Sequence, residues 1–238
     1  MTPAGSRRGQ RLDRYDELRG ERPESFVNPP GAAFEIVFDR TVQLAVADEM
    51  ARRLREAGRP EEFGDIGVVY EDAFVIAVRD AVRFRDGSVR PYIRLLGATV
   101  GTGAAVMPML TDGRILLAWH FRHASRGWQW EIPRGFAEPG DDGATTATRE
   151  LREEVGVAVD KVELLGRITA DGNNDEIYLA RLNAADLPEV MTDDATGEGL
   201  DEIKLVRPAE LARMIADGEI TDEYLLAAYA FAVAKQVW

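Results

Sequence analysis

The sequence predicts a mixed α/β protein in which a small β-rich N-terminal unit with one helix precedes a larger α/β sandwich. Of its 238 residues, 45% are hydrophobic and 30% are charged, which is ordinary for a globular chain with room for a sizeable core. Strand-like runs dominate as far as about Ala98. Beyond that point strands are followed by a helix, further strands and two closing helices.

The first part of the chain divides into a polar arm and the β-rich unit. Residues 1–30 are rich in Arg, Gly and Pro, and they predict a mobile tail or an arm lying on a partner. Within the unit at 31–97, apolar residues recur at helical spacing over 41–58, where Gly58 suits the end of a helix. Strands are expected at 66–70, 73–84 and 89–97, the last two joined by a turn containing Asp86 and Gly87.

The second part, residues 98–238, has the pattern of an α/β sandwich. Strands are expected at 98–110, 114–121, 162–168, 176–182 and 202–206. One helix begins near residue 142 or 143 and ends near Gly156, and helices over 208–217 and 221–236 close the chain. The acidic loop 183–201 is long for a compact domain, and loops of that length are usually functional or mobile.

Charge and composition limit the function. The formal net charge of −13 argues against a nucleic-acid or anionic-membrane surface, although metal ions would let an acidic protein bind a small anionic substrate. The absence of cysteine excludes disulfides and thiolate sites, and two histidines nearly exclude a multi-histidine metal site. The apolar run 225–234 is too short to span a bilayer. No apolar stretch follows the basic N-terminal residues, as a signal peptide would require, so a cytoplasmic location is expected.

Three glutamates, Glu150, Glu153 and Glu154, crowd one edge of the predicted helix. At 100° per residue they fall within roughly 100° of one another, and two carboxylates about 6 Å apart repel by roughly 3 kcal/mol at an effective dielectric near 20. A solvated helix with an Arg149–Glu153 pair is one interpretation. The Gly-rich loop GFAEPGDDG before the helix favours the other, an oxygen-rich site for a hard cation such as Mg²⁺.

Residues 135–157, GFAEPGDDGATTATRELREEVGV, resemble the Nudix box. The positions that match its pattern are Gly135, Arg149, Glu150, Leu151, Glu153, Glu154, Gly156 and Val157. Asp141 stands where the family has Glu, so the charge is kept on a shorter arm. The resemblance implies a Nudix-type α/β/α sandwich with a mixed sheet.

A wider resemblance, over roughly residues 98–236, is to the ADP-ribose pyrophosphatase branch. It rests on the segments 113–141, 172–182 and 217–231, and it implies that the N-terminal unit is a dimerisation domain and the protein a homodimer. Two positions depart from that branch: Asp171 replaces a usual Pro-Gly, and Arg134 replaces a small residue. Both bear on specificity for ADP-ribose rather than on diphosphate hydrolysis.

The resemblance implies metal-dependent hydrolysis of a nucleoside diphosphate sugar, ADP-ribose first, giving AMP and ribose 5-phosphate. Glu150, Glu153 and Glu154 would hold Mg²⁺ or Mn²⁺, with the backbone carbonyl of Arg134 as a further ligand. Arg149 would pair with Asp141 or Glu153 and orient the cluster. The alternatives are another nucleotide sugar, a dinucleotide or a nucleoside triphosphate as substrate, or a Nudix-fold protein that senses a nucleotide without cutting it.

The remaining site residues come from loops and strand ends. The general base is expected at Glu198, Asp201 or Glu202; Glu198 is favoured because glycines flank it, although a solvated loop acid is an equal alternative. Arg122 would grip a phosphate bidentately, or be an ordinary strand-end arginine. Trp128 would stack on a base or pack at a dimer interface.

Overall fold

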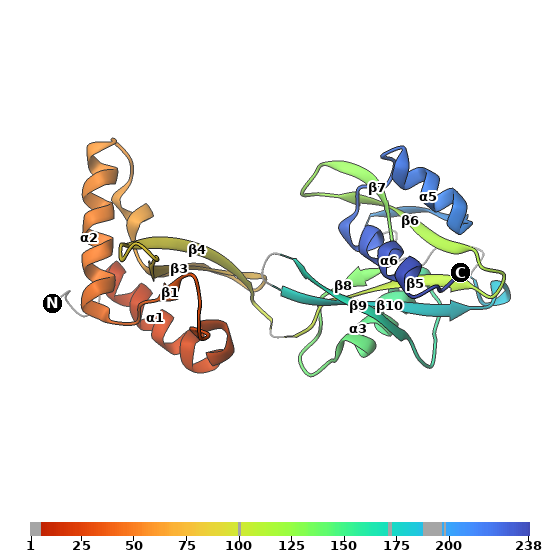
Figure 1. Cartoon of the computed structure of the whole chain (residues 1–238), viewed down its shortest axis with the longest axis horizontal. Coiled ribbons are helices and arrows are strands. Elements are labelled where there is room, and N and C mark those ends of the chain that lie inside the picture. Colours follow the sequence, from red (N-terminus) through yellow and green to blue (C-terminus); the bar gives the residue numbers. More distant parts are fainter. Residues whose placement is uncertain (1–5, 100, 171–172, 188–196, 198) are drawn as a thin grey trace. The chain divides into compact units, whose positions relative to one another are not determined.

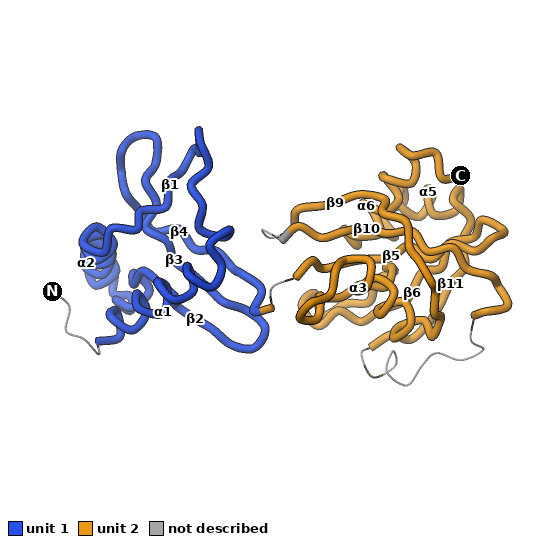
Figure 2. Tube along the Cα trace, turned by 90° about the horizontal axis from the view of Figure 1, so that it is seen from below, with its two compact units in different colours: residues 1–98 blue, residues 99–238 orange. Residues whose placement is uncertain are grey.

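The computed structural model describes residues 6–99, 101–170, 173–187, 197 and 199–238, which form two compact units, residues 1–98 and 99–238 (Figure 2). Unit 1 contains, in chain order, α1 (Arg7–Glu21), η1 (Pro23–Phe26), β1 (Glu35–Ile36), α2 (Arg40–Glu56), η2 (Glu61–Gly64), β2 (Gly67–Glu71), β3 (Val75–Arg83) and β4 (Val89–Gly97). Its sheet is antiparallel, with β3 paired to β1, β2 and β4.

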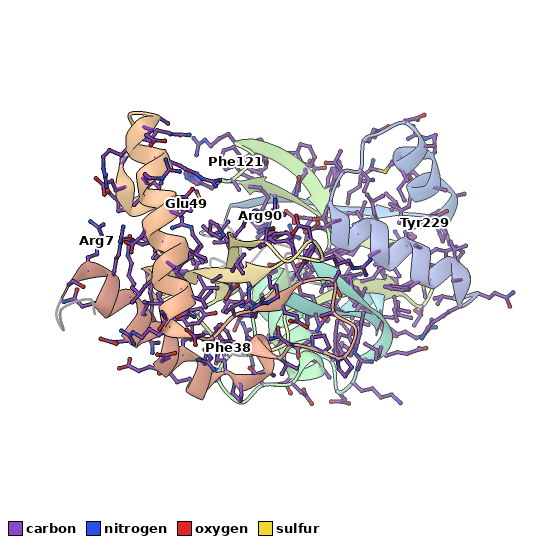
Figure 3. The ribbon with its side chains drawn as sticks, turned by 60° about the vertical axis from the view of Figure 1, so that its left-hand side comes forward. Arg7, Phe38, Glu49, Arg90, Phe121 and Tyr229 are labelled. Atoms are coloured by element: carbon purple, nitrogen blue, oxygen red, sulfur yellow. The ribbon has the colours of Figure 1, made fainter. Side chains whose placement is uncertain are left out.

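The N-terminal arm differs from the expectation of a mobile tail. Residues 7–21 form α1, whose Leu12, Tyr15 and Leu18 are buried against the unit 1 sheet and α2. These residues recur every three positions, which is helical spacing that the surrounding arginines and glycines obscure. The helix is also tied to unit 1 by charge: Arg7 of α1, labelled in Figure 3, forms an ion pair with the buried Asp65.

Unit 2 contains a mixed sheet with helices on both faces. Its elements are β5 (Ala104–Leu110), β6 (Ile115–Arg122), β7 (Gly127–Glu131), β8 (Arg134–Gly135), α3 (Gly143–Glu150), η3 (Leu151–Val155), β9 (Glu163–Ala170), β10 (Asn173–Leu182), η4 (Ala184–Asp186), β11 (Leu200–Val206), α5 (Pro208–Ala216) and α6 (Glu223–Ala234). The strand order is β11-β6-β5-β10-β9; β5 and β10 are parallel, while β7 pairs with β6 and β8 with β5. The predicted α/β/α sandwich with a mixed sheet, preceded by a β-rich unit, is confirmed.

Two apolar cores hold the layers together. One joins α5 and α6 to the sheet through Leu211, Leu225 and side chains such as Leu117. The other joins α3 and η3 to the sheet through Ala147, Leu151 and Leu116. Figure 1 shows α6 and α3 on opposite sides of the strands. Because Leu116 and Leu117 are adjacent on β6, their alternation assigns each face of that strand to one helix layer.

Candidate active site

The loop that enters the box is fixed at both ends. At its start, β8 pairs with β5, placing Gly135 opposite Ala104. At its end, the Asp142 side chain accepts a hydrogen bond from the backbone N–H of Thr145 at 2.8 Å and caps α3. A Cβ added at Gly135 would lie 1.9 Å from Oε1 of Glu150, so only glycine leaves room for that carboxylate beside the chain.

The helix of the box ends in a π-helical turn. Leu151 and Val155 of η3 are fully buried in the core beneath it, and Gly156 closes the turn at φ 78°. Glu150 and Glu154 keep only 7% and 4% of their surface exposed. Carboxylates so far from water require compensating positive charge or hydrogen-bond donors.

Arg149 supplies positive charge to Glu150. Its Nη1 lies 2.8 Å from Oε1 of Glu150 and 2.8 Å from Oε2 of Glu153, and its Nη2 donates to the carbonyl of Phe136 at 2.7 Å. Burial alone would lower the pKa of Arg149, but the charge of Glu150 and the hydrogen bond to Glu153 outweigh it and raise the pKa. Arg149 is therefore a permanent cation that ties both glutamates to the entering loop.

The donor set of the box suits a hard divalent cation by its chemistry. Carboxylate oxygens are ligands that Mg²⁺ and Mn²⁺ accept, and the carboxylate of Glu150 occupies the position that a side chain at Gly135 would fill. Among the residues that the structure describes, no three His, Asp or Glu side chains are gathered around one point. Arg149, which bridges Glu150 and Glu153, stands between two of the three predicted ligands.

Asp141 leaves one buried donor of the cluster without an acceptor. Its Oδ2 lies 3.8 Å from Nε of Arg149, beyond hydrogen-bonding distance, and within the described chain that buried Nε has no hydrogen-bond partner. Asp141→Glu adds one methylene to the arm and is expected to close this contact, stabilising the fold by about 1 kcal/mol. Thermal unfolding without metal measures the gain; Asp141→Asn, which keeps the short arm, serves as the control, and an unchanged midpoint for Asp141→Glu would refute the contact.

Arg122 and Arg134 converge on one buried carboxylate, Glu131 of β7. Arg122 binds it bidentately, with Nε 2.9 Å from Oε1 and Nη2 2.6 Å from Oε2. Arg134 Nη2 lies 3.1 Å from the same Oε2, and Nδ1 of His120 lies 3.1 Å from Oε1. Burial alone would raise the pKa of Glu131, but His120 and the two arginines outweigh it and hold the pKa below its ordinary value.

A second carboxylate ties Arg134 to the last helix. Arg134 Nη2 lies 3.1 Å from Oδ2 of Asp222, the residue that caps α6, and its guanidinium lies 4.3 Å from the ring centre of Tyr224. Tyr224 in turn donates to Oδ2 of Asp175 at 2.6 Å. Burial raises the pKa of Asp222 more than the charge of Arg134 lowers it. The side chain at 134, where a small residue was expected, thus joins β8, β7 and α6.

The other predicted residues lie apart from this cluster or beyond the described chain. Trp128 faces Phe121 across the β6–β7 ladder and stacks on Trp119 at a centroid distance of 6.2 Å. Strand alternation places it on the face of the hairpin opposite Arg122. Glu198 lies outside the described residues, while Asp201 and Glu202 are exposed at the start of β11.

Sequence reasoning assigned no role to Glu131, Asp222 or Tyr224. The available signal for Glu131 was the segment WEIP, in which a charged residue sits between a tryptophan and an isoleucine just before the box. A carboxylate surrounded by apolar residues is an unusual choice for a strand. Asp222 and Tyr224 left no local signal, because their link to Arg134 joins segments far apart in the chain.

Comparison with known proteins agrees with this geometry. The model of the NUDIX domain matches residues 100–229. An ADP-ribose pyrophosphatase of Mycobacterium tuberculosis is 34% identical over 157 residues, which cover 63% of this chain and 72% of the relative. An RNA pyrophosphohydrolase of Dinoroseobacter shibae is 39% identical over 80 residues, which cover 34% of this chain and 44% of that protein. A solved ADP compounds hydrolase superposes with a TM-score of 0.56 at 20% identity, covering 71% of this chain and 90% of its own. The chain therefore belongs to the Nudix family of hydrolases.

Proposed function

We propose that this Nudix pyrophosphohydrolase cleaves the diphosphate linkage of a nucleoside diphosphate sugar in a metal-dependent reaction, with ADP-ribose as the first substrate. Water would add across the phosphoanhydride, giving AMP and ribose 5-phosphate. The observation that carries the proposal is the buried pair Glu150 and Glu154 on the box helix, with Gly135 leaving room for Glu150. The likeness to an ADP-ribose pyrophosphatase over 72% of that relative supports the choice of substrate.

The box glutamates are the proposed ligands for Mg²⁺ or Mn²⁺. Glu150, Glu153 and Glu154, with the backbone carbonyl of Arg134, would hold the ion, which when bound neutralises diphosphate charge and lowers the pKa of a coordinated water. Arg149 orients Glu150 and Glu153 through its two contacts of 2.8 Å. It is therefore proposed as an organiser of the ligand set rather than as a phosphate contact.

Arg122 and Arg134 are the proposed substrate contacts. Both side chains are partly exposed, and Arg134 is adjacent in sequence to Gly135, which touches Glu150. The fixed fork of a guanidinium suits the oxygens of a diphosphate. For the general base, Glu198 remains the sequence prediction, with Asp201 and Glu202 as alternatives.

The oligomeric state is proposed from unit 1. Among the described strands β4 pairs with β3 alone, and it exposes Tyr92, Ile93 and Leu95. An open, apolar sheet edge favours pairing with a second chain. We propose a homodimer through unit 1, which sedimentation analysis would test. Trp128 belongs to unit 2, and its two predicted roles, stacking on a base or packing at a dimer interface, both remain predictions of the sequence.

Location and other partners remain predictions of the sequence. No helix in the described part of the chain is both long and apolar enough to cross a membrane. The net charge of −13 continues to argue against nucleic acid as a partner.

A substrate panel tests the proposed function. Wild-type protein is incubated with ADP-ribose, a second nucleotide sugar, a dinucleotide or a nucleoside triphosphate, in Mg²⁺, in Mn²⁺ or in EDTA. For the substrates whose diphosphate is blocked at both ends, phosphate is then measured after phosphatase treatment, which acts on the monophosphate products but not on an intact diphosphate linkage. For the nucleoside triphosphate, whose terminal phosphate a phosphatase would remove directly, the products are separated by chromatography instead. The expected result is turnover of ADP-ribose with either metal and none in EDTA. Faster turnover of another compound would correct the substrate, and silence throughout together with measurable nucleotide affinity would indicate a sensor.

A further inference from the structure

The carboxylate of Glu131 is the common partner of both proposed substrate arginines. Glu131 is 1% exposed, whereas the side chains of Arg122 and Arg134 remain 29% and 18% exposed. Burying a carboxylate this completely is costly, even when it is paired. Water already solvates the exposed parts of both arginines, so they need no buried carboxylate for that purpose. Solvation of the arginines therefore does not by itself explain why the carboxylate of Glu131 is buried.

The contacts of Glu131 fix one guanidinium while leaving part of it available. Arg122 uses Nε and Nη2 for the bidentate pair, at 2.9 and 2.6 Å. A guanidinium has five N–H donors, and the two on Nη1 take no part in that pair. A side chain held by two parallel hydrogen bonds has lost its rotamer freedom before any ligand arrives.

Arg134 is held from three sides. Its Nη2 lies 3.1 Å from Glu131 and 3.1 Å from Asp222, and the ring of Tyr224 covers the guanidinium. The next residue, Gly135, is the one whose missing Cβ accommodates Glu150. The position of Arg134 is therefore coupled through one peptide unit to the carboxylates proposed to bind metal.

We propose that Glu131 is a positioning residue for diphosphate recognition: it holds the guanidinium groups of Arg122 and Arg134 in their binding geometry beside the box. The inference rests on the function proposed above and assigns Glu131 no contact with the substrate. A side chain that is held in place before binding loses less entropy when the ligand binds. For each such side chain, the affinity rises by about 3- to 10-fold. Loss of this positioning should therefore weaken diphosphate binding more than it slows the chemical step.

A double-mutant cycle with Glu131→Gln and Arg122→Gln tests this role. For wild type, both single variants and the double variant, kcat and KM for ADP-ribose are measured with Mg²⁺, and the Kd of ADP with Mg²⁺ is measured by calorimetry. Glu131→Gln is expected to raise KM and Kd by about 10- to 100-fold with kcat within about 3-fold. In the Arg122→Gln background the same change should cost clearly less, because Arg122 is no longer there to be positioned.

The control is Glu163→Gln, an exposed carboxylate on β9 of the same unit, which should leave all three constants unchanged. Losses that multiply fully in the double variant, or a loss confined to kcat, would overturn the positioning role. Circular dichroism verifies folding. Should Glu131→Gln not fold, Glu131→Asp, which keeps the charge on a shorter arm, replaces it in the same cycle.

Failure of the proposed function gives a different pattern. If wild type binds ADP but hydrolyses nothing in the panel, the proposed hydrolysis is wrong, and the Kd cycle alone still decides the role of Glu131. If wild type neither binds nor cleaves any nucleoside diphosphate, both proposals are wrong.

Discussion

Glu154→Gln is expected to reduce kcat for ADP-ribose hydrolysis by about 10²- to 10⁴-fold, because a bound metal supplies several kcal/mol of charge stabilisation in the transition state. The substitution removes one negative charge at nearly constant shape. Glu154 is 4% exposed on the turn that follows α3. A neutral amide at this position would not repel the neighbouring carboxylates. Folding stability should therefore change little.

Steady-state kinetics with Mg²⁺ measures this loss, and thermal unfolding without metal measures stability. Calorimetric titration of Mg²⁺ in the presence of ADP separates a loss of metal affinity from a loss of chemistry. Glu163→Gln is the matched control, since it removes the same charge from an exposed strand position. Normal turnover by the Glu154 variant would remove this residue from the proposed site.

Asp65→Asn is expected to destabilise unit 1 by about 3 kcal/mol. The substitution removes the negative charge of a fully buried carboxylate that pairs with three arginines. Arg7 and Arg8 reach its two oxygens at 2.8 Å, and Arg11 reaches Oδ2 at 2.7 Å. Together these contacts attach α1 to the segment before β2. The asparagine variant keeps the shape but leaves three guanidinium groups around a neutral side chain.

The location of the tryptophans allows the two units to be followed separately. All four, Trp119, Trp128, Trp130 and Trp238, belong to unit 2, so their emission reports that unit, whereas far-ultraviolet circular dichroism reports both. In urea the dichroism of the Asp65 variant should begin to fall at lower denaturant while the emission transition stays near that of wild type. An unchanged dichroism curve would refute the expectation. Asp48→Asn, which removes an exposed partner of Arg8 alone, should cost no more than about 1 kcal/mol.

The same carboxylate makes unit 1 sensitive to acid. Burial alone would raise the pKa of Asp65, but hydrogen bonds from Arg7 and Arg8 outweigh it and hold the pKa below its ordinary value. A depressed folded-state pKa gives stability that is fully present above the unfolded-state value of about 3.9 and is lost as the pH falls through the lower folded-state value. The difference between wild type and Asp65→Asn should therefore shrink as the pH is lowered below about 4.

Local patterns predicted the box and most of the elements around it. The box helix was expected to end near Gly156, and that glycine closes its last turn. The turn glycines Gly87 and Gly113, at φ 81° and 82°, fell where the strands were expected to reverse. Each of these signals depends on residues close in the chain, where periodicity and backbone freedom act directly.

What the sequence did not reveal depends on distant residues or on side-chain competition. The sequence predicted that Arg149 pairs with Glu153 or Asp141, but not its contact with Glu150, through which the guanidinium bridges two of the glutamates. The link from Arg134 to Asp222 joins β8 to the cap of α6, and no pattern along the chain encodes it. In α1, a few buried apolar residues outweigh a composition typical of disorder.

The parallel pair in the centre of unit 2 has a consequence for how the protein is made. β5 and β10 join residues 104–110 to residues 176–182. This ladder therefore cannot form until the chain has emerged from the ribosome as far as β10. In unit 1, β3 and β4 join residues 75–83 to 89–97, across a short hairpin. Nearby contacts close faster than remote ones, and synthesis proceeds from the N-terminus. The hairpin of unit 1 is thus available for assembly on the nascent chain well before the hydrolase sheet is complete.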